Sequence, residues 1–178
     1  MPTSISILQQ IEKFRVSRHL SISRDRRGNL AINNPPPVNA CGMYWFYTSY
    51  TIDELKACAI SLDPGAIPIN HMARLHEGLP HVSTTEIDGF RLVYNGIAGT
   101  ALGLRGRIHQ HFNGGAGTGC LSILRSSVND LKRWRVSYVA FSPLGSTLHD
   151  AQVDFAADAI DLERTWRLTH GWPLLCRI

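Results

Sequence analysis

The 178-residue sequence lacks several features that would assign it to a class of protein at once. Its cysteines are scattered and form no C-x-x-C pair, so we interpret them as reduced thiols and not as a zinc ribbon or redox couple. No run approaches the ~18 apolar residues of a membrane span, and no apolar core follows a charged N-terminus. Internal repeats and low-complexity tracts are also absent. We expect a soluble, cytoplasmic, globular protein with no membrane partner.

The length and composition fit one domain with an added lobe. Hydrophobic residues make up 44% of the sequence and charged residues 18%, which is globular composition, and two complete catalytic domains do not fit. The run of three prolines in 33–37 can continue neither a helix nor a central strand, so it reads as a linker. We predict an N-terminal helix, basic arm and linker over 1–40, and one domain over 41–178 with an insertion at about 51–89.

The positive charge is concentrated near the N-terminus. The net charge is +4, and residues 1–28 alone carry an excess of four positive charges. Such a basic arm attracts a polyanion, because lysine and arginine contacts with phosphates dominate nucleic-acid affinity. The alternative is a solvated arm that only keeps the protein soluble.

The hydrophobic pattern predicts three strands with helices around them. The strands are expected at 42–50, at 90–97 and around 136–139, ending near 142. The fold class is therefore α/β (α+β): a small, three-stranded, mainly antiparallel sheet flanked by helices, with an N-terminal helical arm and an inserted lobe. Helices are expected at 4–16, from 51 to about 62, around 104–112, at 128–134, and from Thr147 to about His170.

Three segments that lie far apart in the chain read as parts of one site. They are Gly42-Met43-Tyr44, Tyr94-Asn95-Gly96 and the run from Leu104 to His111. Two strands that each carry a tyrosine, followed by a helix that carries arginine and histidine four residues apart, resemble the GIY-YIG nucleases. The resemblance covers roughly residues 41–176. It implies a small sheet on which Tyr44 and Tyr94 lie side by side, with their hydroxyl groups in a cleft.

The resemblance implies a role for each of these side chains in phosphodiester hydrolysis. One tyrosine binds the scissile phosphate and the other orients or activates water, and the sequence does not decide which is the base. Arg107 stabilises the charge of the transition state. His111 stands at the position near the nucleophile where the family often has tyrosine or histidine. Arg107 and His111 share one face of the helix, because residues four apart are neighbours there. By themselves, the two residues would more often be ordinary solvent-facing side chains, and only the tyrosine segments favour a site.

Glu163 is the candidate metal ligand. It stands among apolar residues of the last predicted helix, where a carboxylate is costly unless it is paired or binds a metal. By resemblance, Glu163 is the catalytic glutamate that holds one divalent ion, Mg²⁺ or Mn²⁺, in each active site. The alternative is a partly buried ion pair with Arg167 or Arg107.

Further basic residues are candidates for contacts with the DNA backbone. A basic cluster surrounds Trp134 and consists of Lys132, Arg133 and Arg135. It could bind the DNA backbone, or it could be a solvated helix end in which Trp134 anchors the core. His71, His76 and His81 do not have the spacing of a zinc site. The complete set of expected DNA-binding residues is Arg24, Arg26, Arg27, Arg105, Lys132, Arg133 and Arg135.

The sequence departs from the family pattern in four places. The two tyrosines are fifty residues apart, which implies a lobe inserted between the first two strands. Ile97 stands where many members carry lysine, and Asn95 replaces an aliphatic residue. Cys176 stands near the position where the family often has asparagine after a proline.

The predicted activity is that of a metal-dependent endonuclease that cuts double-stranded DNA at specific sequences, as a restriction enzyme does. The basic arm and the inserted lobe supply surface with which to read bases. One site cuts one strand, so double-strand cleavage requires a homodimer. The alternatives are a structure-specific repair or recombination nuclease, a nonspecific DNase toxin, a DNA-binding module without catalysis, and a nuclease that acts on RNA.

Overall fold

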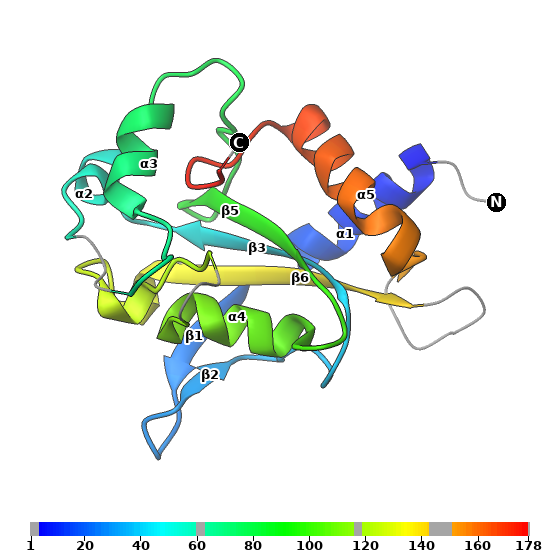
Figure 1. Cartoon of the computed structure of the whole chain (residues 1–178), viewed down its shortest axis with the longest axis horizontal. Coiled ribbons are helices and arrows are strands. Elements are labelled where there is room, and N and C mark those ends of the chain that lie inside the picture. The colour runs from blue at the N-terminus through cyan, green and yellow to red at the C-terminus, as the bar shows by residue number, and fades with distance from the viewer. Residues whose placement is uncertain (1–3, 60–62, 116–118, 143–150, 178) are drawn as a thin grey trace.

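An antiparallel sheet lies at the centre of the protein (Figure 1). The computed structural model describes residues 4–59, 63–115, 119–142 and 151–177. Neighbouring strands are antiparallel in the order β2-β1-β6-β3-β5-β4, and β7 pairs in parallel with the end of β6. The strands are β1 (Leu20–Arg24), β2 (Leu30–Ile32), β3 (Gly42–Thr48), β4 (Glu86–Ile87), β5 (Phe90–Ala98), β6 (Trp134–Ser142) and β7 (Ala151–Gln152).

Helices cover both faces of the sheet (Figure 1). The α-helices are α1 (Ser4–Ser17), α2 (Ile52–Lys56), α3 (Ile69–His76), α4 (Gly103–Asn113) and α5 (Phe155–His170), and the 3₁₀ turns are η1 (Ile123–Arg125) and η2 (Leu131–Arg133). The apolar side of α4 packs against one face, while α1 and α5 pack against the other. Every residue of β3 is buried, which explains its unbroken aromatic run. Burying one large apolar side chain contributes about 1.5–3 kcal/mol.

The α+β class and the three central strands are confirmed, whereas the number of strands is larger than the three predicted. The predicted basic arm contains the β1–β2 hairpin, whose Ile22, Leu30 and Ile32 are buried in the core that α4 also covers. On the other face, α1 contributes Leu8 and Ile11 to the core shared with α5. Residues 4–32 therefore share the two cores of the main body, and the boundary near residue 40 stays a prediction.

The helix predicted over 128–134 is wrong. That segment contains only the short turn η2, and β6 begins at Trp134. Trp134 is fully buried and donates from Nε1 to the Val128 carbonyl oxygen at 2.8 Å, so it anchors the core. Packing of this one side chain on the sheet outweighs the local helical pattern.

Two other helix boundaries differ from the prediction. α2 has the predicted capping box, with Glu54 N–H donating to Thr51 Oγ1 and Thr51 N–H donating to the Glu54 carboxylate. It ends at Lys56, and the predicted end near residue 62 lies outside the described residues. α5 begins at Phe155, where Asp154 caps the first turn. The predicted start at Thr147 also lies outside the described residues.

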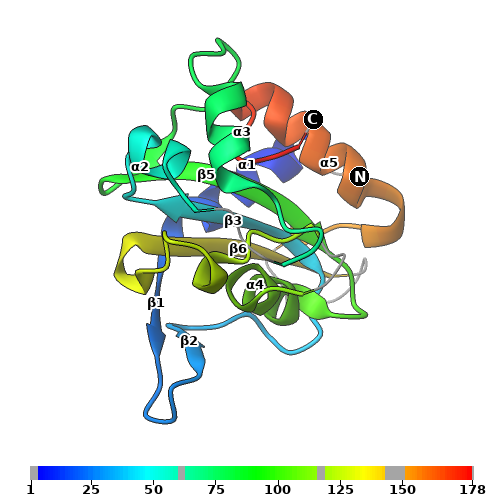
Figure 2. The ribbon, with the colours of Figure 1, turned by 60° about the vertical axis from the view of Figure 1, so that its left-hand side comes forward.

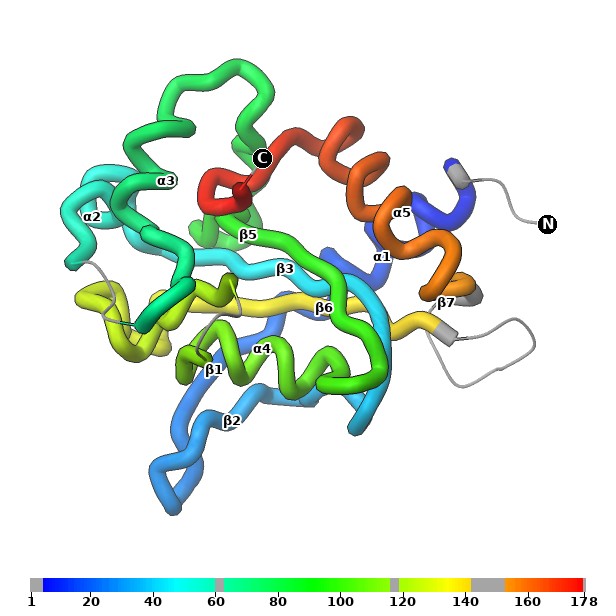
Figure 3. Tube along the Cα trace, in the orientation of Figure 1, coloured from blue at the N-terminus to red at the C-terminus, as the bar shows by residue number. Residues whose placement is uncertain are grey.

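Two segments cover the edge of β5 that does not pair with β3. β4 pairs with Phe90 and Arg91, and the C-terminal segment lies beside the middle of the strand (Figure 3). Leu175 N–H donates to the Val93 carbonyl oxygen at 2.7 Å, and Asn95 N–H donates to Cys176 Sγ at 3.4 Å. Among the described helices, none is long and apolar enough to cross a bilayer.

Candidate active site

The two tyrosines of the predicted site lie side by side on the face of the sheet that α4 covers. Tyr44 of β3 pairs with Gly96 of β5, and Phe46 pairs with Tyr94, so all four residues point to one face. The ring centroids of Tyr44 and Tyr94 are 6.4 Å apart with an interplanar angle of 27°. Strand pairing thus joins positions that are fifty residues apart in sequence.

Gly96 leaves space for the Tyr44 ring. A Cβ atom at position 96 would lie 2.7 Å from Tyr44 Cζ and closer still to its hydroxyl oxygen. Real side chains essentially never approach so closely, so the ring occupies space that only glycine leaves free.

The hydroxyl group of Tyr44 connects the sheet to α4. Its oxygen lies 3.0 Å from His111 Nε2 and accepts a hydrogen bond from Arg107 Nε at 3.3 Å. Leu121 N–H donates to His111 Nδ1 at 3.2 Å, so Nδ1 carries no proton. In a neutral ring the proton is then on Nε2, which donates to Tyr44. The Tyr44 oxygen accepts from both donors, and its own proton is left to point elsewhere.

Burial controls the protonation of this cluster. It lowers the pKa of His111 well below its usual value, and the positive charge of Arg107 lowers it further, so the ring is neutral at pH 7. Burial also raises the pKa of Tyr44 to about 12, even though Arg107 acts in the opposite direction. The pKa of Tyr94 is raised well above its ordinary value, again mainly by burial. Both phenols are protonated near neutral pH.

Arg107 and Tyr94 are the members of the cluster that reach toward solvent. Both side chains are partly exposed, whereas Tyr44 and His111 are 1% and 0% exposed. Arg107 is held by Gln110 Oε1 at 2.6 Å and by its contact with Tyr44. The Tyr94 hydroxyl forms no hydrogen bond with a described residue. A phosphate that approaches this face would therefore meet a guanidinium and a free phenol.

Glu163 lies on α5, whose buried residues pack against the opposite face of the sheet. Its carboxylate pairs with Arg167 at 2.9 Å, and the two side chains are 14% and 13% exposed. The predicted alternative of an ion pair with Arg167 is therefore present. Even so, burial raises the pKa of Glu163 despite the attraction of Arg167. Its negative charge also raises the pKa of Tyr44 and Tyr94, after the larger effect of burial.

Arg167 extends this ion pair into a polar network that the sequence reading missed. Its Nε donates to Asn95 Oδ1 at 2.9 Å, and it also contacts Cys176 Sγ at 3.7 Å. Asn95 is fully buried, and its Nδ2 has no hydrogen-bond partner in the described part of the chain. Burial raises the pKa of the Cys176 thiol to about 12, so this side chain stays neutral. The one signal for this network in the sequence is an asparagine inside a predicted strand, because a polar side chain that becomes buried there needs hydrogen-bond partners.

No family model, curated protein or solved structure matches the chain. Function is therefore inferred from the side chains themselves.

The expected DNA-binding residues lie in three places. Arg24, Arg26 and Arg27 are on the exposed end of the β1–β2 hairpin. Arg105 of α4 donates two hydrogen bonds to the Pro36 carbonyl oxygen, at 3.0 and 2.7 Å. Lys132, Arg133 and Arg135 lie where β6 begins, away from the tyrosines.

Two members of this last group are engaged within the protein. The guanidinium of Arg133 lies 3.7 Å from the centre of the Tyr50 ring and forms an ion pair with Glu54 at 2.6 Å. Arg135 pairs with Tyr47 across the sheet, on the face opposite Tyr44, and stacks over Phe90 at 4.2 Å. The structure therefore does not bring the Lys132–Arg135 group to the tyrosine cluster.

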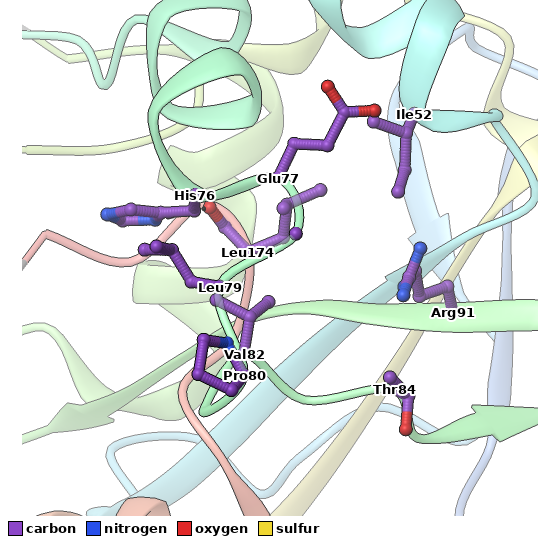
Figure 4. Close-up of a pocket in the computed structure, with 10 residues that line it drawn as sticks. Ile52, His76, Glu77, Leu79, Pro80, Val82, Thr84, Arg91 and Leu174 are labelled. Carbon is purple, nitrogen blue, oxygen red and sulfur yellow. Dashed lines mark hydrogen bonds between the residues drawn. The ribbon is translucent and has the colours of Figure 1, made fainter.

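The inserted lobe contains a separate cavity of about 250 Å³ (Figure 4). Arg91, Glu77 and Thr84 contribute polar groups to an otherwise mainly apolar lining. His76 is buried beside this cavity, and its Nδ1 lies 2.8 Å from the Leu174 carbonyl oxygen. In the described residues, no group of three or more histidine, cysteine or acidic side chains could hold a metal by itself.

Proposed function

We propose that this protein is a metal-dependent DNA endonuclease of the GIY-YIG type. The observation that supports this proposal most is the convergence of Tyr44, Tyr94, Arg107 and His111 on one face of the sheet. A phenol pair beside a guanidinium is suited to a phosphodiester, because the reaction places negative charge on the phosphoryl oxygens. The reaction class is phosphodiester hydrolysis.

The environments of the two tyrosines suggest different roles. Tyr94 has a free, partly exposed hydroxyl group and would donate a hydrogen bond to the scissile phosphate together with Arg107. Tyr44 accepts from Arg107 and His111, so its oxygen is fixed in place. By elimination, Tyr44 is the phenol left to orient the attacking water and exchange a proton with it, which requires water to reach its buried hydroxyl group when DNA binds. Neutral His111 acts as a donor to Tyr44 and not as the base.

The site fits a divalent ion that takes most of its ligands from outside the protein. Mg²⁺ usually keeps several waters and is bound through one or two carboxylates and the phosphates of the substrate. Glu163 would supply that carboxylate, and its raised pKa shows that Arg167 does not fully offset its burial. When bound, Mg²⁺ or Mn²⁺ would supply positive charge next to the phosphate.

The test is incubation of the purified protein with a mapped supercoiled plasmid, with and without magnesium. Wild-type protein should cut only with magnesium, and Arg107→Ala and Glu163→Ala should each lose cutting while still binding DNA. Arg164→Ala is the matched control, since Arg164 lies on the same helix as Glu163 with its side chain 69% exposed. Full cutting by both active-site variants would disprove the assignment.

The products also distinguish the biological alternatives. Discrete fragments would support sequence-specific cleavage of double-stranded DNA by two copies of the chain, since one site cuts one strand. Nicks at branches would indicate a repair or recombination nuclease, and a smear would indicate a toxin. A DNA-binding module without catalysis remains a second candidate, because the buried neutral thiol of Cys176 offers no ligand to a hard cation. It predicts DNA binding with no product.

A further inference from the structure

The β1–β2 hairpin leaves the sheet as a free ribbon (Figure 2). Only Leu20 and Ser21 of β1 pair with β6, whereas Ile22 to Arg24 pair with β2 alone. Three residues at ~3.3 Å per residue carry the ribbon about 10 Å beyond the last pair with β6. The side chains of Ile22, Ile32 and Leu30 are buried, so one face of the ribbon packs on the core as far as the Arg24–Leu30 pair, and the exposed turn over 25–29 stands clear of it.

The tip of the hairpin is held in one conformation. Asp25 Oδ1 accepts hydrogen bonds from the backbone N–H groups of Arg27 and Asn29, both at 2.8 Å. Gly28 has a φ of +80°, which favours glycine, and its N–H donates to the Asp25 carbonyl oxygen at 2.9 Å. The hydrogen bonds from Asn29 lower the pKa of Asp25, so its carboxylate stays charged and serves the turn.

Two arginine side chains remain free at this tip. Arg24 donates to the Gly28 carbonyl oxygen at 2.8 Å and so braces the turn. The side chains of Arg26 and Arg27 are exposed, and neither forms a hydrogen bond or ion pair with a described residue. The tip therefore presents two unpaired guanidinium groups on a rigid support, which favours a partner rich in acceptor atoms.

We infer that this hairpin enters the major groove of double-stranded DNA and that Arg26 and Arg27 read base edges there. This inference rests on the proposed DNA substrate and adds the element that gives sequence specificity. The major groove is about 12 Å wide and 8.5 Å deep and admits a two-stranded β-ribbon, and arginine binds guanine O6 and N7 with two hydrogen bonds. The minor groove, about 6 Å wide, is too narrow for a ribbon whose strands alone are ~4.8 Å apart.

The position of the hairpin suits a duplex bound across α4. Arg105 of α4 is bonded to the Pro36 carbonyl oxygen, four residues after β2 ends, so the hairpin base and α4 are tied together. Figure 2 shows β2 beside α4, with the tip pointing away from the body. We place the duplex across α4, with a phosphate at Arg107 on one side of the helix and the hairpin on the side of Arg105. The deep, narrow major groove of RNA would not accept it.

The test compares two variants with the same change in charge. Arg26→Ala/Arg27→Ala removes both tip arginines, and Lys13→Ala/Arg164→Ala removes two exposed cations from α1 and α5. The probe is the duplex that wild-type protein selects from a random-sequence library in EDTA, where binding occurs without cleavage. Fluorescence anisotropy compares its dissociation constant with that of a scrambled duplex, and dimethyl sulfate reports protection of guanine N7 in the major groove.

The tip variant should lose preference for the selected duplex by roughly 5- to 150-fold for each arginine that contacts a guanine, and should lose N7 protection. The control variant should keep both. Equal weakening on both duplexes, with the salt slope reduced by about two, would place the tip on phosphates and overturn the inference. A wild-type protein that cuts DNA without sequence preference would overturn it too. In this test, a wild-type protein that binds no DNA would instead defeat the proposed function.

Discussion

Gly96→Ala is the most direct test of the tyrosine cluster, because it adds one methyl group where the Tyr44 ring already lies. The new carbon would sit 2.7 Å from Tyr44 Cζ. Ordinary van der Waals contact begins at about 3.4–4 Å, so the ring must move by about 1 Å. Tyr44 is fully buried between β3 and α4, and its movement would stretch the hydrogen bonds to His111 and Arg107.

The expected cost has two parts. Overpacking of a buried site costs typically about 1–3 kcal/mol of unfolding free energy. A misplacement of about 1 Å at a reacting centre lowers the catalysed rate by about 100-fold. Gly99→Ala is the matched control, because its new carbon would approach only the Phe155 ring, at 3.3 Å.

The assay is urea denaturation of both variants together with initial rates of plasmid cleavage. A Tyr44→Leu background should remove most of the stability cost of Gly96→Ala, because the ring that it collides with is gone. Wild-type stability and cutting for Gly96→Ala would refute the placement of the Tyr44 ring over position 96.

Three further outcomes follow from the same site. Acidification from pH 6.5 to 4.5 should destabilise the protein by up to about 1.4 kcal/mol per pH unit for His111, whose folded pKa is lowered and whose unfolded form takes up the proton. When the free energy of unfolding is measured by urea denaturation at each pH, His111→Gln should show a smaller slope against pH than wild type. The contributions of His19 and His109 have the same sign as that of His111 but are present in both proteins, so they cancel in the comparison. The cleavage rate should rise from pH 6 to 9 without an inflection near pH 6.5, since the pKa of Tyr44 is about 12 and His111 stays neutral; an inflection there would make His111 the base. Glu163→Gln should lose cutting but only about 1–2 kcal/mol of stability, because Arg167 keeps its bond to Asn95, and a melt that shows global unfolding would contradict this.

The central elements could be predicted because their signals are local. The aromatic run of β3 and the aromatic and apolar residues of β5 each identify a strand without help from the rest of the chain. The capping box at Thr51 fixes the start of α2 in the same way. Arg107 and His111 share a helix face because residues four apart are always neighbours on a helix.

The β1–β2 hairpin was missed although a signal was present. Leu20 and Ile22 alternate with serines, and Leu30 and Ile32 follow a turn that contains Gly28. The basic residues between these runs favour an irregular basic arm, and so the strands on either side of them were not predicted. Exposed charge and buried apolar residues are compatible in one hairpin, because alternate strand residues face opposite sides and the turn stands clear of the core.

The polar partners within the site depend on contacts that are distant in sequence. Leu121 determines which His111 nitrogen carries the proton, and Asn95 meets Arg167 across 72 positions. Neither pairing follows from a spacing rule. They appear only when the loop after α4 and the helix α5 are placed on the sheet.

The covered side of β5 limits how two copies of this chain could associate. An exposed strand edge invites another chain to extend the sheet through backbone hydrogen bonds. In this protein β4, Thr85 and the segment around Leu175 and Cys176 already occupy donors and acceptors on this edge from Phe90 to Asn95. A continuous intermolecular sheet through β5 would first require the C-terminal segment to detach. Two molecules that act together on one duplex would therefore meet at another surface, and β5 would stay paired within its own chain.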